Sequence, residues 1–401
     1  MTERVVVTGI GLLSAIGNDY HSFAKNVLAG TNGIAQVSAF DPEPLAARLG
    51  GEVDIDLSEH FPEAQLRRMD RCSMLAVVAA RQSMAMAGLD ASHYDKTRVG
   101  VFLGTTLGGM IGATAYYEAF ARKKEQRLSY LQDYPLYSAG ARVIEDFGFS
   151  GPNLAFSTAC SSGNVALGHG ADYIRHGRCD MVLAGGVDTM AKITLAGFNA
   201  LKNVSPEAIR PFDRNRTGVV LSEAAAILVL ESETRARARG ATILAEIAGY
   251  GMSTDAYHMT APDATGRGPA LAVSRALAQA GLTPADIDHV NAHGTATKHN
   301  DEIEARVIRK VFGTLADGIP VTSTKSQHGH ALGAAGAVEA AAAIAAIQES
   351  RVPPTLNHEE TDPKCNVDVV AGAPRDHRVN AVLSNNFGFG GNNCTVIFTH
   401  T

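Results

Sequence analysis

Short apolar runs alternate with longer helical patterns along the whole chain. Strands that are bounded by turn residues and separated by helices are typical of a layered α/β fold. The runs that predict strands lie at 4–9, 99–104, 181–185, 225–231, 243–249, 289–292 and 381–384. We therefore expect a layered α/β protein.

The same order of elements occurs twice. A helix, a loop, a strand and a Gly-Thr turn are followed by a strand, a turn and a helix, and then by a short strand that runs into a glycine-containing turn. The paired segments are 84–105 with 277–295, 153–176 with 320–348, and 180–188 with 380–388. We interpret the chain as two similar halves, 1–245 and 246–401, neither of which is a free-standing domain.

One helical stretch, at 331–348, consists almost entirely of Ala, Gly, Val, Leu and Ile. A helix that is apolar all round is a buried helix. Its charged residue is Glu339, and a buried carboxylate is costly without a partner. Lys325, in the turn segment before the helix, is the first candidate for that partner. The alternative is that Glu339 lies on a face that reaches solvent, where most Glu side chains are found.

The composition narrows the class of protein. A chain of 401 residues with 45% hydrophobic and 19% charged residues is an ordinary globular protein, which excludes disordered and fibrous classes. A formal net charge of −6 argues against general binding to nucleic acid. Five cysteines without a paired spacing indicate neither a disulfide framework nor a Cys-rich zinc site, and they fit a reducing compartment.

The N-terminal sequence enters an apolar strand at Val5 without a charged segment and a long apolar segment before it. We also expect no apolar run long enough to cross a bilayer. The sequence therefore predicts a soluble cytoplasmic protein that binds neither membrane nor nucleic acid.

Three turns, each after a predicted strand, carry reactive side chains among small residues. They offer the thiol of Cys160 and the imidazoles of His293 and His330. This set suits the chemistry of a carbon nucleophile better than peptide hydrolysis, which needs one Cys, one His and an orienting amide or carboxylate. In a duplicated fold corresponding strand ends come together, so we expect the Cys160 turn to approach the turn at 325–330.

The position of Cys160 just before a helix adds to this hypothesis. At a helix N-terminus, unpaired N–H groups and the positive end of the dipole favour a thiolate. The same N–H groups could bind a developing oxyanion. The alternative is that Cys160 is a small buried apolar residue and that each His is structural, which is the commoner situation for such residues taken singly.

Two further patterns have a structural and a functional interpretation. His328 and His330 alternate and could chelate, but no carboxylate or third His stands at a recognisable ligand spacing, so we expect no metal centre. The run 385–393 holds Phe387 and Phe389 among glycines and amides. It is either a hairpin with packed rings or a gate that closes an apolar tunnel.

Taken together, these residues resemble the elongating β-ketoacyl-acyl carrier protein synthases, the condensing enzymes of fatty acid and polyketide synthesis. The segments that carry the resemblance span essentially the whole chain, and their order makes them specific. They are 7–11, 157–163, 184–188, 210–213, 251–258, 291–295, 325–330 and 387–391. The resemblance implies a thiolase-like fold, with two duplicated halves in a layered α-β-α-β-α arrangement.

The resemblance also implies roles for individual residues. Cys160 matches the family's nucleophile, which accepts the acyl chain as a thioester before a malonyl group loses CO2 and attacks it. The other matches are His293 and His330 for decarboxylation and the enolate oxygen, Lys325 and Glu339 as supporting residues, the N–H groups of Cys160 and Phe389 as oxyanion hole, Phe387 and Phe389 as gate, Thr295 and Thr297 for pantetheine, and Leu107 and Phe198 at the acyl pocket.

The implied partner is an acyl carrier protein, whose phosphopantetheine arm carries the substrates, and no other cofactor is implied. This carrier is acidic in the family, and the visible basic pairs are Arg67 with Arg68 and Lys123 with Lys124. The alternative for these pairs is a merely solvated face. The polar segment 113–135 resembles the family's capping region at the dimer interface. We expect a homodimer, with a heterodimer with a chain-length factor as the alternative.

Some residues depart from the pattern that is common in the fatty acid enzymes. They are the run 298–301, Gln327, His328 and Asn392. These departures leave the pathway open between fatty acid and polyketide synthesis. Three relatives of the same fold are weaker candidates: a partner subunit without the nucleophile, a CoA thiolase with a second Cys as base, and an initiating synthase with Asn in place of His330.

Overall fold

The computed structural model describes residues 3–90, 92–125 and 127–401, and a mixed sheet of ten strands runs through it. From the centre outward, the first half of the chain contributes β1 (Val5–Leu13), β8 (Ala224–Ser232), β6 (Met181–Asp188), β4 (Val99–Gly104) and β5 (Asn153–Phe156). The second half contributes β9 (Ala245–Thr254), β15 (Asn392–Thr399), β14 (Ala381–Gly388), β10 (His289–Asn291) and β11 (Val321–Thr322). The halves meet where β1 pairs with β9, Val6 opposite Glu246 and Val7 opposite Ala245.

Each half of the sheet has the same pattern of strand directions. The inner pairs are antiparallel, β1 with β8 and β8 with β6 in one half, and β9 with β15 and β15 with β14 in the other. The outer pairs are parallel in both, from β6 through β4 to β5 and from β14 through β10 to β11. Strands that the repeated sequence pattern pairs therefore occupy equivalent places in the sheet.

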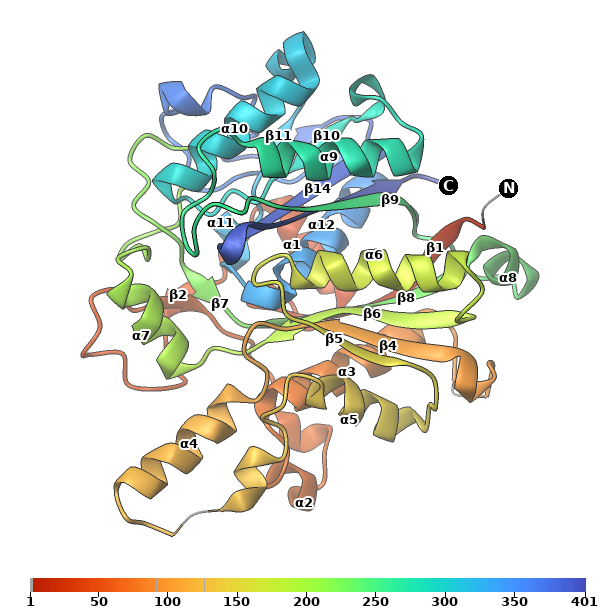
Figure 1. Cartoon of the computed structure of the whole chain (residues 1–401), viewed down its shortest axis with the longest axis vertical. Helices are drawn as coiled ribbons and strands as arrows, with labels where there is room; N and C mark the ends of the chain where they lie inside the picture. The colour runs from red at the N-terminus through yellow and green to blue at the C-terminus, as the bar shows by residue number, and fades with distance from the viewer. Residues whose placement is uncertain (1–2, 91, 126) are drawn as a thin grey trace.

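The elements stack in five layers, as Figure 1 shows. The helices α6 (Ser162–Arg175) and α12 (Ala335–Glu349) lie between the two halves of the sheet. One outer face is covered by α3 (Arg71–Met86) and α5 (Ser138–Phe147), and the other by α9 (Arg267–Ala280) and α10 (Lys298–Phe312). The predicted α/β fold with α-β-α-β-α layers is confirmed.

Glycines allow the two central helices to touch. A Cβ at Gly163 of α6 would lie 2.9 Å from the backbone nitrogen of Ala337, and one at Gly336 of α12 would lie 2.7 Å from that of Asn164. Since these distances are shorter than ordinary Cβ contacts, the two backbones pack with no side chain between them. The contact brings the first turns of α6 and α12 side by side.

One helical segment is apolar enough to resemble a membrane span. Residues Leu332–Glu349 are long and apolar enough to cross a bilayer, so the expectation that no such run exists is wrong. However, 89% of this segment is buried inside the protein, and α12 contacts strands of both halves. Its hydropathy therefore reflects burial on all sides in the core.

A helical arm projects from the layered body (Figure 1). It contains α4 (Met110–Ala121) and the 3-10 helix η3 (Leu128–Leu131). The segment 113–135 is polar with several Tyr, and large apolar side chains are exposed on this arm and just after it. They are Tyr117, Phe120, Leu128, Tyr134, Leu136 and Tyr137. Such a group is typical of a surface that binds another protein.

The remaining α-helices and strands lie outside the large sheet and the helices named above. They are the helices α1 (Tyr20–Ala29), α2 (Glu63–Leu66), α7 (Lys192–Ala200), α8 (Glu233–Ala238) and α11 (Lys325–His328), a sheet of β2 (Ile34–Gln36), β3 (Leu49–Gly51) and β7 (Leu221–Ser222), and a pair of β12 (Arg351–Val352) and β13 (Arg375–Asp376). Strands β1, β9 and β14 run past their predicted ends, because glycines and amides interrupt their apolar pattern without ending the strand. Strand β15 of the large sheet is missing from the predicted strands, and so are all the strands of the two small sheets.

Candidate active site

The turn that carries Cys160 connects β5 to α6. Ala159 has a left-handed backbone with a φ of 51°, which is strained for a residue with a Cβ. Ser162 closes the turn, because its Oγ accepts from the Thr158 N–H at 2.9 Å and donates to the Ala159 carbonyl at 2.6 Å. From the other side, a Cβ at Gly388 would lie 3.1 Å from the Cys160 nitrogen, so a larger residue there would press on the turn. These contacts hold the thiol in one place.

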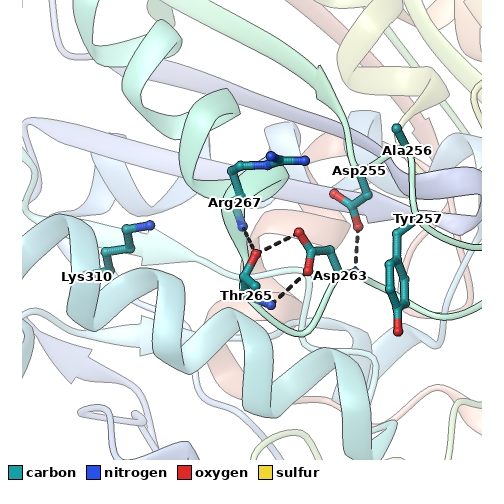
Figure 2. A pocket seen from close by; sticks show the side chains of 7 residues that line it. All are labelled: Asp255, Ala256, Tyr257, Asp263, Thr265, Arg267 and Lys310. Carbon is teal, nitrogen blue, oxygen red and sulfur yellow. Dashed lines mark hydrogen bonds between the residues drawn. The ribbon is translucent and has the colours of Figure 1, made fainter.

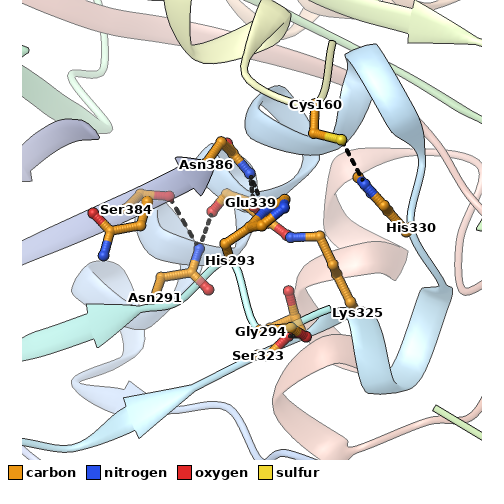
Figure 3. A network of polar contacts seen from close by, with 12 residues as sticks. Cys160, Asn291, His293, Gly294, Ser323, Lys325, His330, Glu339, Ser384 and Asn386 are labelled. Carbon is orange, nitrogen blue, oxygen red and sulfur yellow. Dashed lines mark hydrogen bonds and ion pairs between the residues drawn. The ribbon is translucent and has the colours of Figure 1, made fainter. Parts of the chain in front are cut away.

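His330 lies beside this thiol. Its Nε2 is 3.0 Å from Cys160 Sγ, within hydrogen-bond distance (Figure 3). The backbone of His330 is held at the edge of the small sheet, since its N–H donates to the Val220 carbonyl at 2.8 Å and its carbonyl accepts from the Ser222 N–H at 2.9 Å. Gly329, with a φ of 80°, makes the left-handed turn before it. The structure thus brings the first and third turns together.

His293 reaches the same space from the end of β10. The backbone N–H groups of His293 and Gly294 each donate to an oxygen of Glu304, a buried residue of α10, at 2.8 Å. The rings of His293 and His330 lie edge to face, with their centroids 5.4 Å apart. A ring nitrogen of each His and the sulfur of Cys160 all lie within 4.8 Å of one another. One thiol and two imidazoles, contributed by both halves of the chain, therefore share one site.

A buried polar chain lies behind the two histidines (Figure 3). Lys325 Nζ donates to Glu339 Oε1, and both side chains are fully buried, so the alternative that Glu339 faces solvent is wrong. Glu339 Oε2 accepts from Asn386 Nδ2 at 2.7 Å, and the same Nδ2 lies 3.2 Å from His293 Nδ1. Burial raises the pKa of Glu339, and Lys325 and Asn386 oppose that rise. Pairing offsets much of the cost of burying the two charges.

Burial dominates the acid–base properties of the site. It raises the pKa of the Cys160 thiol to about 11, although Lys325 and the N–H groups of Phe389 and Cys160 lower that pKa. Burial and the nearby Lys325 hold the pKa values of His293 and His330 well below their ordinary range. The site therefore contains a neutral thiol and two neutral imidazoles at pH 7. The effect of desolvation on the pKa of Cys160 is therefore larger than the effect of the helix N-terminus, from which the sequence predicts a thiolate.

Two backbone N–H groups from different elements lower the pKa of the Cys160 thiol by hydrogen bonding. They belong to Cys160, before α6, and to Phe389, after β14. Two converging N–H groups can stabilise a developing oxyanion. The ring of Phe389 stacks on that of Phe198 with centroids 5.7 Å apart, and the ring of Phe387 lies 6.2 Å from that of His293. The two aromatic residues of the glycine-rich run thus flank the reactive groups.

A cavity of about 510 Å³ adjoins these groups. The residues that line it include Cys160, His293, His330, Thr295, Thr297, Phe198, Phe387, Phe389, Lys202 and Lys298. The hydroxyl oxygens of Thr295 and Thr297 are 3.1 Å apart. Leu107 is not among the described residues that line this cavity, and it packs instead in the apolar cluster that contains Phe198. Of the two residues considered for an acyl pocket, this cavity therefore contains Phe198.

A second hollow, of about 550 Å³, shares Asp255 with the first (Figure 2). Asp255 accepts from Asn393 Nδ2 at 2.7 Å and from the Asp263 N–H at 3.0 Å, and the side chains of Arg267 and Lys310 also line the hollow. No thiol or imidazole occurs among the described residues of this lining. The reactive groups converge on the first cavity, which is the candidate active site.

The thiol and the two imidazoles could also be considered as metal ligands, since zinc prefers such donors. Their surroundings oppose a cation. The charge of Lys325 lies close enough to lower the pKa of both His293 and His330. Moreover, Cys160 would have to lose a proton that burial retains. The donor set therefore fits covalent chemistry at the sulfur better than a metal centre.

The basic pairs considered for docking lie away from this cavity. Arg67 and Arg68 follow α2, and Lys123 and Lys124 follow α4, at the end of the molecule opposite α10 (Figure 1). All four side chains are exposed, and Arg67 pairs with Glu63 one turn earlier. Such an exposed pair adds little stability, so it leaves Arg67 available to a partner. Within one chain these residues do not meet the reactive groups.

Three polar residues that hold the site together escape the sequence pattern. Glu304 anchors the His293 turn, Asn386 links His293 to Glu339, and Asp188 ties the turn after β4 to the turn before α12 by accepting from their backbone N–H groups. The available signal is a polar residue that ends an apolar strand, as Asp188 ends β6 and Asn386 lies near the end of β14. That signal alone does not reveal what each residue contacts.

Comparisons with known proteins agree with this geometry. Residues 2–236 match the family model of the β-ketoacyl synthase N-terminal domain, and 244–359 match its C-terminal domain. The chain is 38% identical over 410 residues to 3-oxoacyl-[acyl-carrier-protein] synthase 2 of Staphylococcus aureus (strain COL), covering 99% of this chain and 98% of the relative. It is 40% identical over 401 residues to nodulation protein E of Rhizobium meliloti (strain 1021), covering 99% of each. The solved structure of the ishigamide ketosynthase/chain length factor matches with a TM-score of 0.96 and 34% identity, covering 100% of both chains.

Proposed function

The chain belongs to the β-ketoacyl synthase family, and we propose that it is a β-ketoacyl-acyl carrier protein synthase, an acyltransferase that lengthens an acyl chain by decarboxylative condensation with a malonyl group. The observation that carries this proposal is the 3.0 Å contact between Cys160 Sγ and His330 Nε2, with His293 in the same buried space. A thiol can accept an acyl chain, and two neutral imidazoles can bind an enolate oxygen. The substrates arrive on the phosphopantetheine arm of the carrier, and no other cofactor takes part.

In the first half-reaction Cys160 receives the acyl chain. As Sγ attacks the thioester carbonyl, its proton moves to His330 Nε2 and then to the departing pantetheine thiol. The carbonyl oxygen becomes an oxyanion within reach of the N–H groups of Cys160 and Phe389. Because burial keeps the free thiol protonated at pH 7, the proton leaves as the bond to carbon forms, and the charge of Lys325 favours that change.

In the second half-reaction a malonyl group loses CO2. The bond to its carboxylate breaks, and the electron pair forms an enolate whose oxygen accepts hydrogen bonds from His293 and His330. Neutral imidazoles donate these bonds without delivering the proton that would quench the carbanion, and their low pKa values keep them neutral. The carbanion then attacks the acyl carbonyl on Cys160, and the carbon–sulfur bond breaks. The released thiolate takes up a proton from solvent, which its raised pKa favours.

Supporting roles fall to residues around these three. Lys325 and Glu339 set the electrostatic field, Thr295 and Thr297 bind the pantetheine arm, Phe387 and Phe389 form the gate, and Phe198 with Leu107 behind it bounds the acyl pocket. The two halves divide the work, because residues 1–245 supply the nucleophile and the projecting arm, and residues 246–401 supply both histidines.

The protein works as a dimer in the cytoplasm and takes its substrates from an acidic carrier protein. The exposed apolar side chains of the arm support pairing with a second subunit. The exposed pairs Arg67 with Arg68 and Lys123 with Lys124 support docking of the carrier.

A second candidate is the catalytic ketosynthase subunit of a polyketide synthase that needs a chain-length factor. The observation that favours it is the match to the ishigamide ketosynthase/chain length factor at a TM-score of 0.96. The apolar arm would then pair with a different chain rather than with a second copy.

One experiment tests the function and separates the two candidates. The purified chain alone is mixed with a carrier protein that bears an isotope-labelled acyl group and with malonyl carrier protein. Mass spectrometry then follows the labelled acyl group. Elongation by the chain alone supports the homodimeric synthase. Acylation of Cys160 without elongation supports the subunit that needs a partner, and absence of label from Cys160 refutes both.

A further inference from the structure

We propose that Asn386 is a positioning residue that holds His293 in the tautomer with its proton on Nε2. The proposal rests on the proposed function, because the tautomer matters for the step in which His293 donates to the enolate oxygen. Its basis is the buried chain from Lys325 through Glu339 and Asn386 to His293 (Figure 3). In this series of hydrogen bonds, the donor or acceptor role of each group fixes the role of the next group.

The orientation of the Asn386 amide follows from Glu339. Lys325 donates to Oε1 of Glu339, which holds this group as a carboxylate that can only accept. The amide group that faces Oε2 at 2.7 Å must therefore be the NH2, since a carbonyl oxygen there would face negative charge. Asn386 Oδ1 is buried and has no hydrogen-bond partner in the described part of the chain. The orientation is thus imposed by Glu339 and not by a bond to Oδ1.

The orientation of the amide in turn decides the tautomer of His293. The NH2 group has two hydrogens; one points to Glu339, and Nδ2 lies 3.2 Å from His293 Nδ1. A neutral imidazole nitrogen that accepts a hydrogen bond carries no proton of its own. The proton of His293 is therefore on Nε2, and His293 lines the cavity. Nε2 can then donate to an enolate oxygen, whereas the opposite tautomer would present a lone pair to it.

His330 lacks a comparable anchor. Its Nδ1 is buried and makes no hydrogen bond to any residue that the structure describes, while its Nε2 contacts Cys160 Sγ at 3.0 Å. An imidazole without a fixed tautomer suits proton exchange with a thiol, and an imidazole with a fixed tautomer suits a permanent donor. The two histidines are equally buried, but they differ in what the second nitrogen touches.

Nitrogen NMR on protein with 15N-labelled histidine tests the tautomer, with the His293 signals identified by their loss in His293→Ala. In the wild type we expect a protonated Nε2 and a bare Nδ1. In Asn386→Leu, Nδ1 loses its donor, so the two tautomers mix and the two nitrogen signals move toward each other. Release of CO2 from malonyl carrier protein should then fall on the order of 10²-fold, and acylation of Cys160 should fall far less. Asn26→Leu removes a half-buried amide in α1 that donates to the Ile16 carbonyl at 2.6 Å, and it should leave the His293 signals unchanged.

A proton on Nδ1 of His293 in the wild type would overturn the proposal, whether or not the variant folds. An unchanged His293 spectrum in Asn386→Leu would overturn it too. Equal losses of acylation and CO2 release would also do so, because a merely structural role predicts them. A wild-type enzyme that releases no CO2 from malonyl carrier protein refutes the proposed function instead, and the spectrum still reports the tautomer.

Discussion

The two halves of the protein bring the same strand, turn and helix to the site, but with different electrostatic character. In the first half, residues 153–171 around Cys160 contain no Asp, Glu, Lys or Arg. In the second half, the equivalent stretch buries Lys325 and Glu339 together with His330. The nucleophile is therefore neutral within its own segment and gains reactivity from charges in the other half. Burial keeps the thiol protonated until a thioester arrives, and Lys325 of the other half acts against burial by lowering the pKa of the thiol.

We expect the largest effect from removing the nucleophile that the first half contributes. Cys160→Ala removes the thiol of the site and should lower condensation on the order of 10⁴-fold or more. The acyl label on the intact protein, measured by mass spectrometry, should disappear with it. Cys394→Ala removes another buried thiol outside the site and should keep activity. If the Cys160→Ala protein were acylated as strongly as the wild type, the nucleophile would be another residue.

The second half is tested by breaking its ion pair. Lys325→Met leaves Glu339 buried without a counter-charge and should lower the free energy of unfolding by about 3–5 kcal/mol. Adding Glu339→Gln to that variant should recover much of the loss, because the unpaired charge is gone. Urea denaturation of the three proteins measures both values. If Lys325→Met alone were as stable as the wild type, the charges of Lys325 and Glu339 would not stabilise each other.

The pH dependence of the thiol measures the balance between burial, which raises its pKa, and Lys325 of the second half, which lowers it. Since the pKa of Cys160 is raised to about 11, the thiolate fraction should grow about tenfold for each pH unit between pH 7 and pH 10. The rate of alkylation by iodoacetamide should rise in the same proportion. A thiol with an ordinary pKa near 8.5 would level off within this range. Cys160→Ala identifies the signal of this residue, and a plateau by about pH 9 would show that burial does not control the thiol.

The smallest effect concerns the surface. Arg67→Glu with Arg68→Glu should raise the KM for the carrier-bound substrates by roughly 5–10-fold through charge repulsion. Turnover of small acyl thioesters should stay the same. Lys25→Glu with Lys96→Glu makes the same change in net charge at two other exposed positions. Equal losses with carrier-bound and small substrates, or with the two charge reversals, would argue against docking at Arg67 and Arg68.

The repeated pattern made much of the fold predictable. It pairs the Cys160 turn with the turn at 325–330, and the structure places these turns together because equivalent strands take equivalent places in the sheet. The partner of Glu339 is predictable for a different reason. A lone charge in a fully apolar helix needs a counter-charge, and Lys325 lies in the turn segment just before that helix.

Other features depend on contacts that no local pattern records. The raised pKa of Cys160 reflects the depth of burial, which depends on every element packed around the turn. The bridge made by Asn386 requires β14, β10 and α12 to meet at one point. Leu107 is not among the described residues that line the cavity, because it packs in the apolar cluster that it shares with Phe198. The sequence pattern does not reveal this packing.

The left-handed backbone of Ala159 sets a limit for protein engineering. Left-handed conformation costs a residue with a Cβ about 1–2 kcal/mol, so Ala159→Gly is a substitution that stability-guided design would choose early. Yet the same change would loosen the turn that aims the sulfur at His330. Heat resistance is better sought at Gly197 in α7, where an added Cβ meets open space.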